Sequence, residues 1–84
     1  MNTLATSLDF DEHTMWVNLA DGRRLGVPLA WFPRLLKASK EERLDFEISG
    51  GGKGLHWDSL DEDISVAALL AGQGDITRPV AHAA

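Results

Sequence analysis

The first thirty residues alternate between apolar and polar positions in three separate runs, a pattern typical of half-buried β-strands. Residues 11–13 join the first two runs, and residues 20–22, which include an Asp-Gly pair, join the last two. Connections this short make neighbouring strands antiparallel, and Asp-Gly favours a tight turn. Proline cannot donate to a β-ladder, so Pro28 predicts that the third strand frays or lies at a sheet edge. The runs expected to face the core are Leu4, Thr6, Leu8 and Phe10; Met15, Val17 and Leu19; and Leu25, Val27 and Leu29.

After residue 30 the apolar period changes from two to that of a helix. Trp31, Leu35 and Ala38 follow helical spacing, and Phe32 and Leu36 broaden the apolar stripe. Proline near the start of a helix costs little, because the first N–H groups have no intrahelical partner. The pattern therefore predicts a helix that begins close to Pro33 and packs Trp31, Leu35 and Ala38 against the core.

The remaining elements are short. Ser39-Lys40-Glu41-Glu42 matches a capping box, in which the serine and glutamate side chains satisfy each other's backbone N–H groups. Asp63 or Ser65 is a suitable cap for the last helix, and Gly72 is a common residue just beyond a helix end. We expect helices over 40–44 and 64–71, and strands over 46–49 and 55–57.

These elements predict an α+β fold: an antiparallel meander of four to five strands with two or three short helices packed on it. A chain of 84 residues has room for one hydrophobic core. We therefore expect residues 1–72 to form a single α+β domain. Residues 73–84 show no periodicity and are expected to form a flexible C-terminal tail.

The amino-acid composition excludes some kinds of functional site and disfavours others. The chain has no cysteine, which excludes disulfides, thiolate metal sites and cysteine nucleophiles. It has no apolar run long enough to span a bilayer and no signal-peptide pattern, so a cytoplasmic protein without membrane attachment is expected. The net charge is −5; residues 43–84 hold three basic and seven acidic side chains, against five and six in residues 1–42. This balance disfavours nucleic-acid binding by the isolated domain and suits a basic partner.

Most of the candidate chemistry lies in GGGKGLHWDSLDEDIS, residues 50–65. The glycines match neither the Walker loop nor the dinucleotide fingerprint, so we interpret them as a turn with positive φ or close backbone approach. His56-Trp57 is expected to close the core. Asp61 does not start an EF-hand, because Val66 stands where that loop requires glycine. A less favoured alternative is that carboxylates of this segment bind a hard cation such as Ca²⁺.

No enzyme motif is present in the sequence. His13, His56 and His82 lack zinc-site spacing, and His56, Asp58 and Ser59 are adjacent in sequence without implying triad geometry. We therefore expect a non-enzymatic protein with no cofactor, no metal and no catalytic residues. The hard-cation alternative would use Asp58, Asp61 and Asp63.

Two features suggest a protein interface. Trp16 falls on the strand face opposite Met15, Val17 and Leu19, and an outward tryptophan is a frequent interface anchor, although helices packed over both faces of the sheet would bury it. The acids after Trp57 supply charge for a basic partner. The predicted partner-binding residues are Trp16, Asp58, Asp61, Glu62 and Asp63.

The run DGRRLGVPLAWFPRLLKAS, followed by EER and GGGKGLHWDSLDEDISVAALLAG, resembles a widespread bacterial family, the domain of unknown function family DUF2442. The resemblance spans roughly residues 5–72 and implies a small α+β fold. Family members resemble the N-terminal part of a larger helix-turn-helix protein, and others occur beside a second small protein in an arrangement resembling toxin–antitoxin pairs. Ala30 and Lys40 depart from the Ser and Pro that members often have.

The resemblance supplies no catalytic residues to carry over. Together with the acidic second half, it leads us to expect a non-catalytic protein-interaction module, an antitoxin-like partner of a small basic protein encoded nearby. The alternative is an accessory domain of a transcriptional regulator that binds DNA only as a dimer or in a complex. The oligomeric state is not predicted, although the edge strand at Pro28 is compatible with a dimer.

Overall fold

The three alternating runs form an antiparallel meander in the order β1-β2-β3, here called the N-terminal sheet. In the first run Ala5 and Leu8 are buried and Thr6 is exposed, which differs from the expected face because the β1–β2 register shifts between Ala5 and Ser7. The computed structural model describes residues 3–72. The expected tail, residues 73–84, lies outside the described residues. Pro28 ends the edge strand, as predicted. The strands are β1 (Ala5–Phe10), β2 (Thr14–Leu19) and β3 (Arg24–Pro28).

Aspartates shape the two turns of this sheet. The Asp11 carboxylate accepts hydrogen bonds from the backbone N–H groups of His13 and Thr14, at 3.0 and 2.8 Å. These bonds add to the backbone bond of the turn, in which the Asp11 N–H donates to the Thr14 carbonyl oxygen at 3.0 Å. In the second turn Gly22 has φ +94°, a conformation that side chains other than glycine rarely adopt. The Asp-Gly signal therefore identified the turn correctly.

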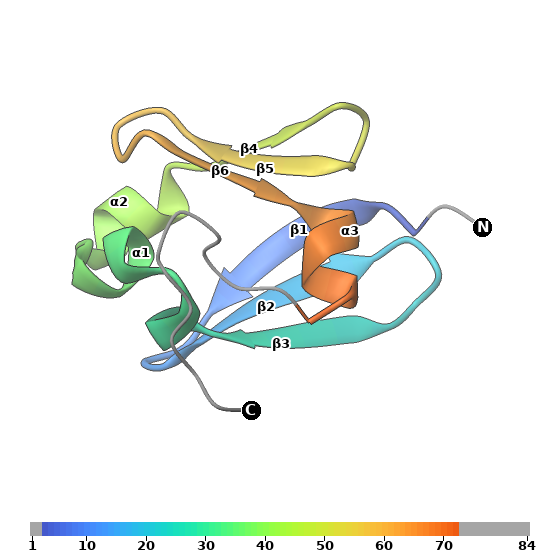
Figure 1. Cartoon of the computed structure of the whole chain (residues 1–84), viewed down its shortest axis with the longest axis horizontal. Helices are drawn as coiled ribbons and strands as arrows, with labels where there is room; N and C mark the ends of the chain where they lie inside the picture. Colours follow the sequence, from blue (N-terminus) through green and yellow to red (C-terminus); the bar gives the residue numbers. More distant parts are fainter. Residues whose placement is uncertain (1–2, 73–84) are drawn as a thin grey trace.

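The second half of the chain contributes a separate three-stranded antiparallel sheet, β4-β5-β6, here called the C-terminal sheet. The sequence predicted one meander of four to five strands; the structure has two sheets, which stack with the core between them (Figure 1). The missed strand is β6, whose acidic residues hid an alternation that buries Glu62 and Ile64. The strands are β4 (Glu47–Ser49), β5 (Gly54–Trp57) and β6 (Glu62–Ser65).

The helices are shorter than the apolar pattern suggested. A 3₁₀ turn over Leu29–Trp31 precedes α1 (Pro33–Lys37), and α3 is Val66–Leu70 rather than 64–71. Phe32 separates the turn from α1 because a residue before proline is pushed toward extended backbone, here φ −130° and ψ 92°. Trp31 is consequently 39% exposed instead of lying in a continuous helical stripe.

The capping box is present as predicted at the start of α2 (Lys40–Leu44). The Ser39 hydroxyl accepts from the Glu42 N–H at 3.1 Å, and the Glu42 carboxylate accepts from the Ser39 N–H at 2.9 Å. Ser65 caps α3 with a single bond, its hydroxyl accepting from the Ala68 N–H at 3.3 Å. These bonds satisfy backbone donors that a five-residue helix cannot satisfy internally.

Replacing the α2 cap gives a stability prediction. Ser39→Ala should lower the free energy of unfolding by about 1 kcal/mol, because the Glu42 N–H loses the Ser39 hydroxyl as its acceptor, whereas the backbone N–H of residue 39 can still donate to Glu42. Urea denaturation followed by circular dichroism measures this. Ser59→Ala, an exposed serine in the β5–β6 turn, is the control and should cost much less. Equal losses in the two variants would contradict the capping role.

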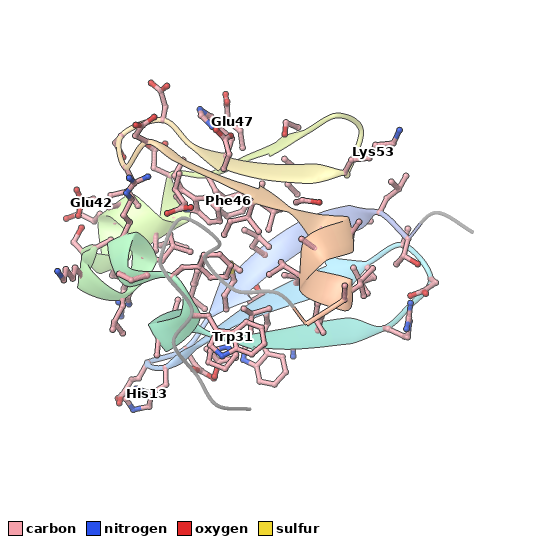
Figure 2. The ribbon with its side chains drawn as sticks, in the orientation of Figure 1. His13, Trp31, Glu42, Phe46, Glu47 and Lys53 are labelled. Carbon is pink, nitrogen blue, oxygen red and sulfur yellow. The ribbon has the colours of Figure 1, made fainter. Side chains whose placement is uncertain are left out.

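The core lies between the two sheets. The N-terminal sheet contributes residues such as Met15 and Val17, and the C-terminal sheet contributes Leu55 and Trp57, all at 0–1% exposure. Phe46 points inward between the sheets (Figure 2), with its ring centroid 6.4 Å from that of Trp57. The Trp57 indole N–H donates to the Arg43 carbonyl oxygen at 2.9 Å. Trp57 therefore closes the core, as expected, and also ties β5 to α2.

The glycine-rich segment is a turn that docks one sheet on the other. Gly50, Gly51 and Gly52 all have positive φ, between +60° and +110°. The Gly52 carbonyl oxygen accepts from the Ala5 N–H at 2.8 Å, and a Cβ on Gly52 would lie 2.7 Å from the Leu4 Cβ. The interpretation as a turn with positive φ and close backbone approach is confirmed.

Candidate functional site

The predicted acidic contacts gather around the turn between β5 and β6. Asp58 and Asp61 lie in this turn, which is closed by the Asp61 N–H donating to the Asp58 carbonyl oxygen at 3.3 Å. Asp63 follows on β6, and all three are exposed. Glu62 differs from the expectation, because its side chain is only 7% exposed. Strand alternation turns Glu62 inward between two outward-facing neighbours, so it is not a surface contact.

One further acid joins this group from β4. Glu47 pairs directly with His56 in the β4–β5 register, and His56 pairs with Asp63 in the β5–β6 register. Residues paired across a sheet share one face, so the three side chains form a row on the outer face of the C-terminal sheet. Figure 2 shows Glu47 projecting away from the rest of the molecule. We call the group Glu47, Asp58, Asp61 and Asp63 the acidic edge.

His56 lies within the acidic edge rather than in the core. Its Nδ1 is 2.6 Å from the Asp63 Oδ1, and its Nε2 is 3.5 Å from the Asp58 Oδ1. The hydrogen bond with Asp63 raises the pKa of His56, burial acts in the opposite direction, and Asp58 adds a smaller rise. The expectation that His56 helps to close the core is corrected, because it faces the opposite side of β5 from Trp57.

The turn is held from its other side by α1. The Arg34 guanidinium donates to the Asp61 carbonyl oxygen at 2.6 Å. Asp61 has φ +51°, a left-handed conformation that Asp and Asn tolerate better than most residues. Arg34 therefore positions the turn while leaving the Asp61 carboxylate at the exposed surface.

The geometry around His56 does not match acid–base catalysis by a serine triad. Such a triad needs a hydroxyl at the imidazole nitrogen that faces away from the aspartate. Here that nitrogen faces the second carboxylate, Asp58. Within residues 3–72, the His, Asp and Glu side chains form no group of three or more that could hold a metal ion, so the Asp58, Asp61 and Asp63 alternative gains no support.

Trp16 lies on the outer face of the N-terminal sheet and is half-buried. Its indole N–H donates to the Asp11 carboxylate at 3.0 Å, and the Arg24 guanidinium stands 4.9 Å from its ring centroid. The ring covers Gly26, where a Cβ would lie 2.8 Å from Trp16 Cζ3. Trp16 is therefore held by its own sheet, and the structure does not place it beside the acidic edge.

Four basic residues of α1 and α2 are here called the basic line: Arg34, Lys37, Lys40 and Arg43. Two of them, Arg34 and Arg43, donate hydrogen bonds within the protein. Arg43 donates to the carbonyl oxygens of Leu35 and Leu36 at 2.7 and 2.8 Å, which holds α1 against α2. Beside α2 is an open hollow of about 510 Å³ lined by Phe10, Asp11, Glu12, Lys40, Arg43 and Leu44. Its lining carries both signs of charge and does not indicate one class of ligand.

Two contributors to the acidic edge were missed by the sequence analysis. Glu47 was visible as an outward position of the fourth strand, but the register that pairs it with His56 was not. Arg34 was not predicted to hold this turn, because its bond to the Asp61 carbonyl oxygen joins residues 27 positions apart and depends on the tertiary fold.

Comparison with known proteins identifies the family. The family model described as Protein of unknown function (DUF2442) matches residues 5–75. The chain belongs to the DUF2442 family. The resemblance seen in the sequence is thereby confirmed. None of the curated proteins matches the chain.

Two solved structures share the fold of this DUF2442 chain. A crystal structure of a protein of unknown function from Rhodospirillum rubrum has a TM-score of 0.78 at 32% identity, covering 88% of this chain and 92% of that one. The solution structure of the uncharacterized protein CV0863 from Chromobacterium violaceum has a TM-score of 0.71 at 28% identity, covering 93% and 70%. Within residues 3–72, no helix is long and apolar enough to cross a membrane.

Proposed function

We propose that this DUF2442 protein is a non-catalytic protein-interaction module that docks a small basic protein on its acidic edge. The observation that carries the proposal is the gathering of exposed carboxylates at one end of the C-terminal sheet. The Asp58 and Asp63 side chains are 97% and 77% exposed. Clustered surface charge of one sign steers an oppositely charged partner and orients it on docking.

The scaffold around these carboxylates favours docking over chemistry. Hydrogen bonds to backbone oxygens hold this turn: the Asp61 N–H donates to the Asp58 carbonyl oxygen, and Arg34 donates to the Asp61 carbonyl oxygen. Neither bond uses the Asp58 or Asp61 carboxylate, and both residues are exposed to a partner. An antitoxin-like role with a small basic protein encoded nearby is the finer form of this proposal, supported by the family resemblance.

The test is calorimetric binding between this protein and the small basic protein encoded by the neighbouring gene. Asp58→Asn/Asp61→Asn should weaken binding about tenfold, because each exposed carboxylate contributes about 0.7 kcal/mol to a rim ion pair. Asn keeps the shape of both side chains and tolerates the left-handed conformation of residue 61.

Glu12→Gln/Glu41→Gln is the matched control. It removes the same net charge from two exposed positions outside the acidic edge, and it should change affinity less than threefold. Equal weakening by both double variants would show that net charge alone drives binding. Absence of binding at low salt would refute the docking of this partner.

The DNA-binding alternative has no specific support in this geometry. DNA binding would use the basic line, but two of its four residues, Arg34 and Arg43, already donate to backbone carbonyl oxygens of the protein itself. A steeply salt-dependent gel shift of the protein's own promoter, with or without the basic protein, would favour that alternative.

A further inference from the structure

The position of His56 between two carboxylates has a consequence for its protonation. A neutral imidazole has one N–H donor, whereas an imidazolium has two. His56 Nδ1 lies 2.6 Å from the Asp63 carboxylate and Nε2 lies 3.5 Å from that of Asp58. Only the imidazolium directs an N–H at both. In the neutral ring that donates to Asp63, a nitrogen lone pair faces the negative charge of Asp58.

The charged groups around His56 come from three parts of the C-terminal sheet. Asp63 faces it from β6, Asp58 from the β5–β6 turn, and Glu47 from the paired position on β4. All three are acids, so a proton on His56 offsets one negative charge at the centre of the acidic edge. Loss of that proton restores the full negative charge of the edge and removes the attraction that holds Asp58.

We propose that His56 is a proton-operated clasp of the β5–β6 turn: the imidazolium holds Asp58 and Asp63 together, and the neutral ring releases Asp58 and makes the acidic edge more negative toward a basic partner. The clasp itself stands on the geometry of His56. Its effect on binding rests on the proposed function.

The same contacts determine how the stabilising effect of protonated His56 changes with pH. The Asp63 hydrogen bond raises the pKa of His56, so the proton is held more tightly in the folded chain than in the unfolded one. A raised folded-state pKa contributes stability that is fully present below the unfolded value of about 6.5. That contribution is lost as the pH rises through the folded-state pKa. The clasp is therefore closed in mildly acidic solution and open in mildly alkaline solution.

Nuclear magnetic resonance of the isolated protein tests the clasp. The imidazole Cε1–H signal of His56 gives its titration, and the heteronuclear NOE of the amides of residues 58–61 reports the order of the turn. From pH 5.5 to 9, we expect the NOE of these amides to fall with the same midpoint as His56, which should lie above about 6.5.

His56→Gln should give a low, pH-independent NOE in residues 58–61, because glutamine carries no cation. His13→Gln is the control, since His13 is exposed beside Glu12, 3.8 Å away, in a turn of the other sheet; it should leave the NOE step unchanged. A turn whose NOE stays constant while His56 titrates, or a step that persists in His56→Gln, would overturn the clasp.

Binding of hexalysine at low salt tests whether loss of the His56 proton strengthens the attraction of the acidic edge for a basic partner. The wild type should bind roughly three- to tenfold more tightly at pH 8.5 than at pH 6, the effect of removing one nearby positive charge at the surface. His56→Gln should bind equally at both values, with an affinity near that of the wild type at pH 8.5. If hexalysine does not bind at any pH while the NOE step is present, the docking proposal fails and the clasp stands.

Discussion

Gly52→Ala should lower the free energy of unfolding by about 3 kcal/mol or more, a large part of the several kcal/mol expected for a domain of this size. At φ +110° a side chain strains the backbone by about 1–3 kcal/mol. The added Cβ would also lie 2.7 Å from the Leu4 Cβ and 2.8 Å from the Ala5 carbonyl oxygen. Both atoms are fixed to the start of β1, so the glycine turn would separate from the N-terminal sheet.

Gly51→Ala is the matched control for this prediction. Gly51 also has positive φ, +67°, but a Cβ there has nothing within 4 Å. It should cost only the backbone strain of about 1–2 kcal/mol. Urea denaturation followed by circular dichroism compares the two variants. Equal losses would show that strain alone matters and that the turn does not need close approach to β1.

Trp57→Ala should be similarly damaging, with a loss of about 3–5 kcal/mol. Trp57 is fully buried between the sheets, and its ring contacts Phe46. Its indole N–H also satisfies the Arg43 carbonyl oxygen, which a truncated side chain leaves without that donor. Trp57→Phe keeps most of the volume and should lose about 2 kcal/mol, from the hydrogen bond and the smaller ring.

Trp31→Ala separates the loss at Trp57 from a general effect of removing tryptophan. Trp31 is 39% exposed, so its truncation should cost about 1 kcal/mol or less. Circular dichroism is the suitable signal, because these substitutions change the tryptophan fluorescence itself. A loss in Trp31→Ala as large as that in Trp57→Ala would contradict the assignment of Trp57 as the residue that closes the core.

Local sequence signals predicted local structure well in this chain. The period-two runs produced β1 to β3, Asp-Gly marked a tight turn, and the serine–glutamate pair formed the capping box of α2. Each of these features depends on residues within a few positions of one another. The positive-φ glycines were also identified, because glycine alone adopts such backbone conformations freely.

Features that depend on distant contacts were predicted less well. β6 was missed because its alternation includes a buried glutamate, Glu62, which the sequence analysis grouped with the partner-binding acids before the last helix. With β6 unrecognised, the second sheet could not be separated from the first. The outward position of His56 was missed for the same reason, since its contact with Asp63 exists only when β5 and β6 pair.

The candidate site was predicted in part. Asp58, Asp61 and Asp63 are exposed around one turn, whereas Glu62 is buried and Trp16 lies on the other sheet. Charge and spacing located the acidic segment, but strand register decides which of its members face solvent. The same register brings Glu47 and His56 into the acidic edge.

Backbone amide shifts of this protein, measured as the proposed partner (a small basic protein encoded nearby) is added, test the central claim most directly. We expect the shifted amides to cluster in β5, β6 and their turn, and at Glu47 on β4, with the outer face of the N-terminal sheet unchanged. Shifts centred on Trp16 or on α1 and α2, or no shifts at low salt, would contradict docking on the acidic edge.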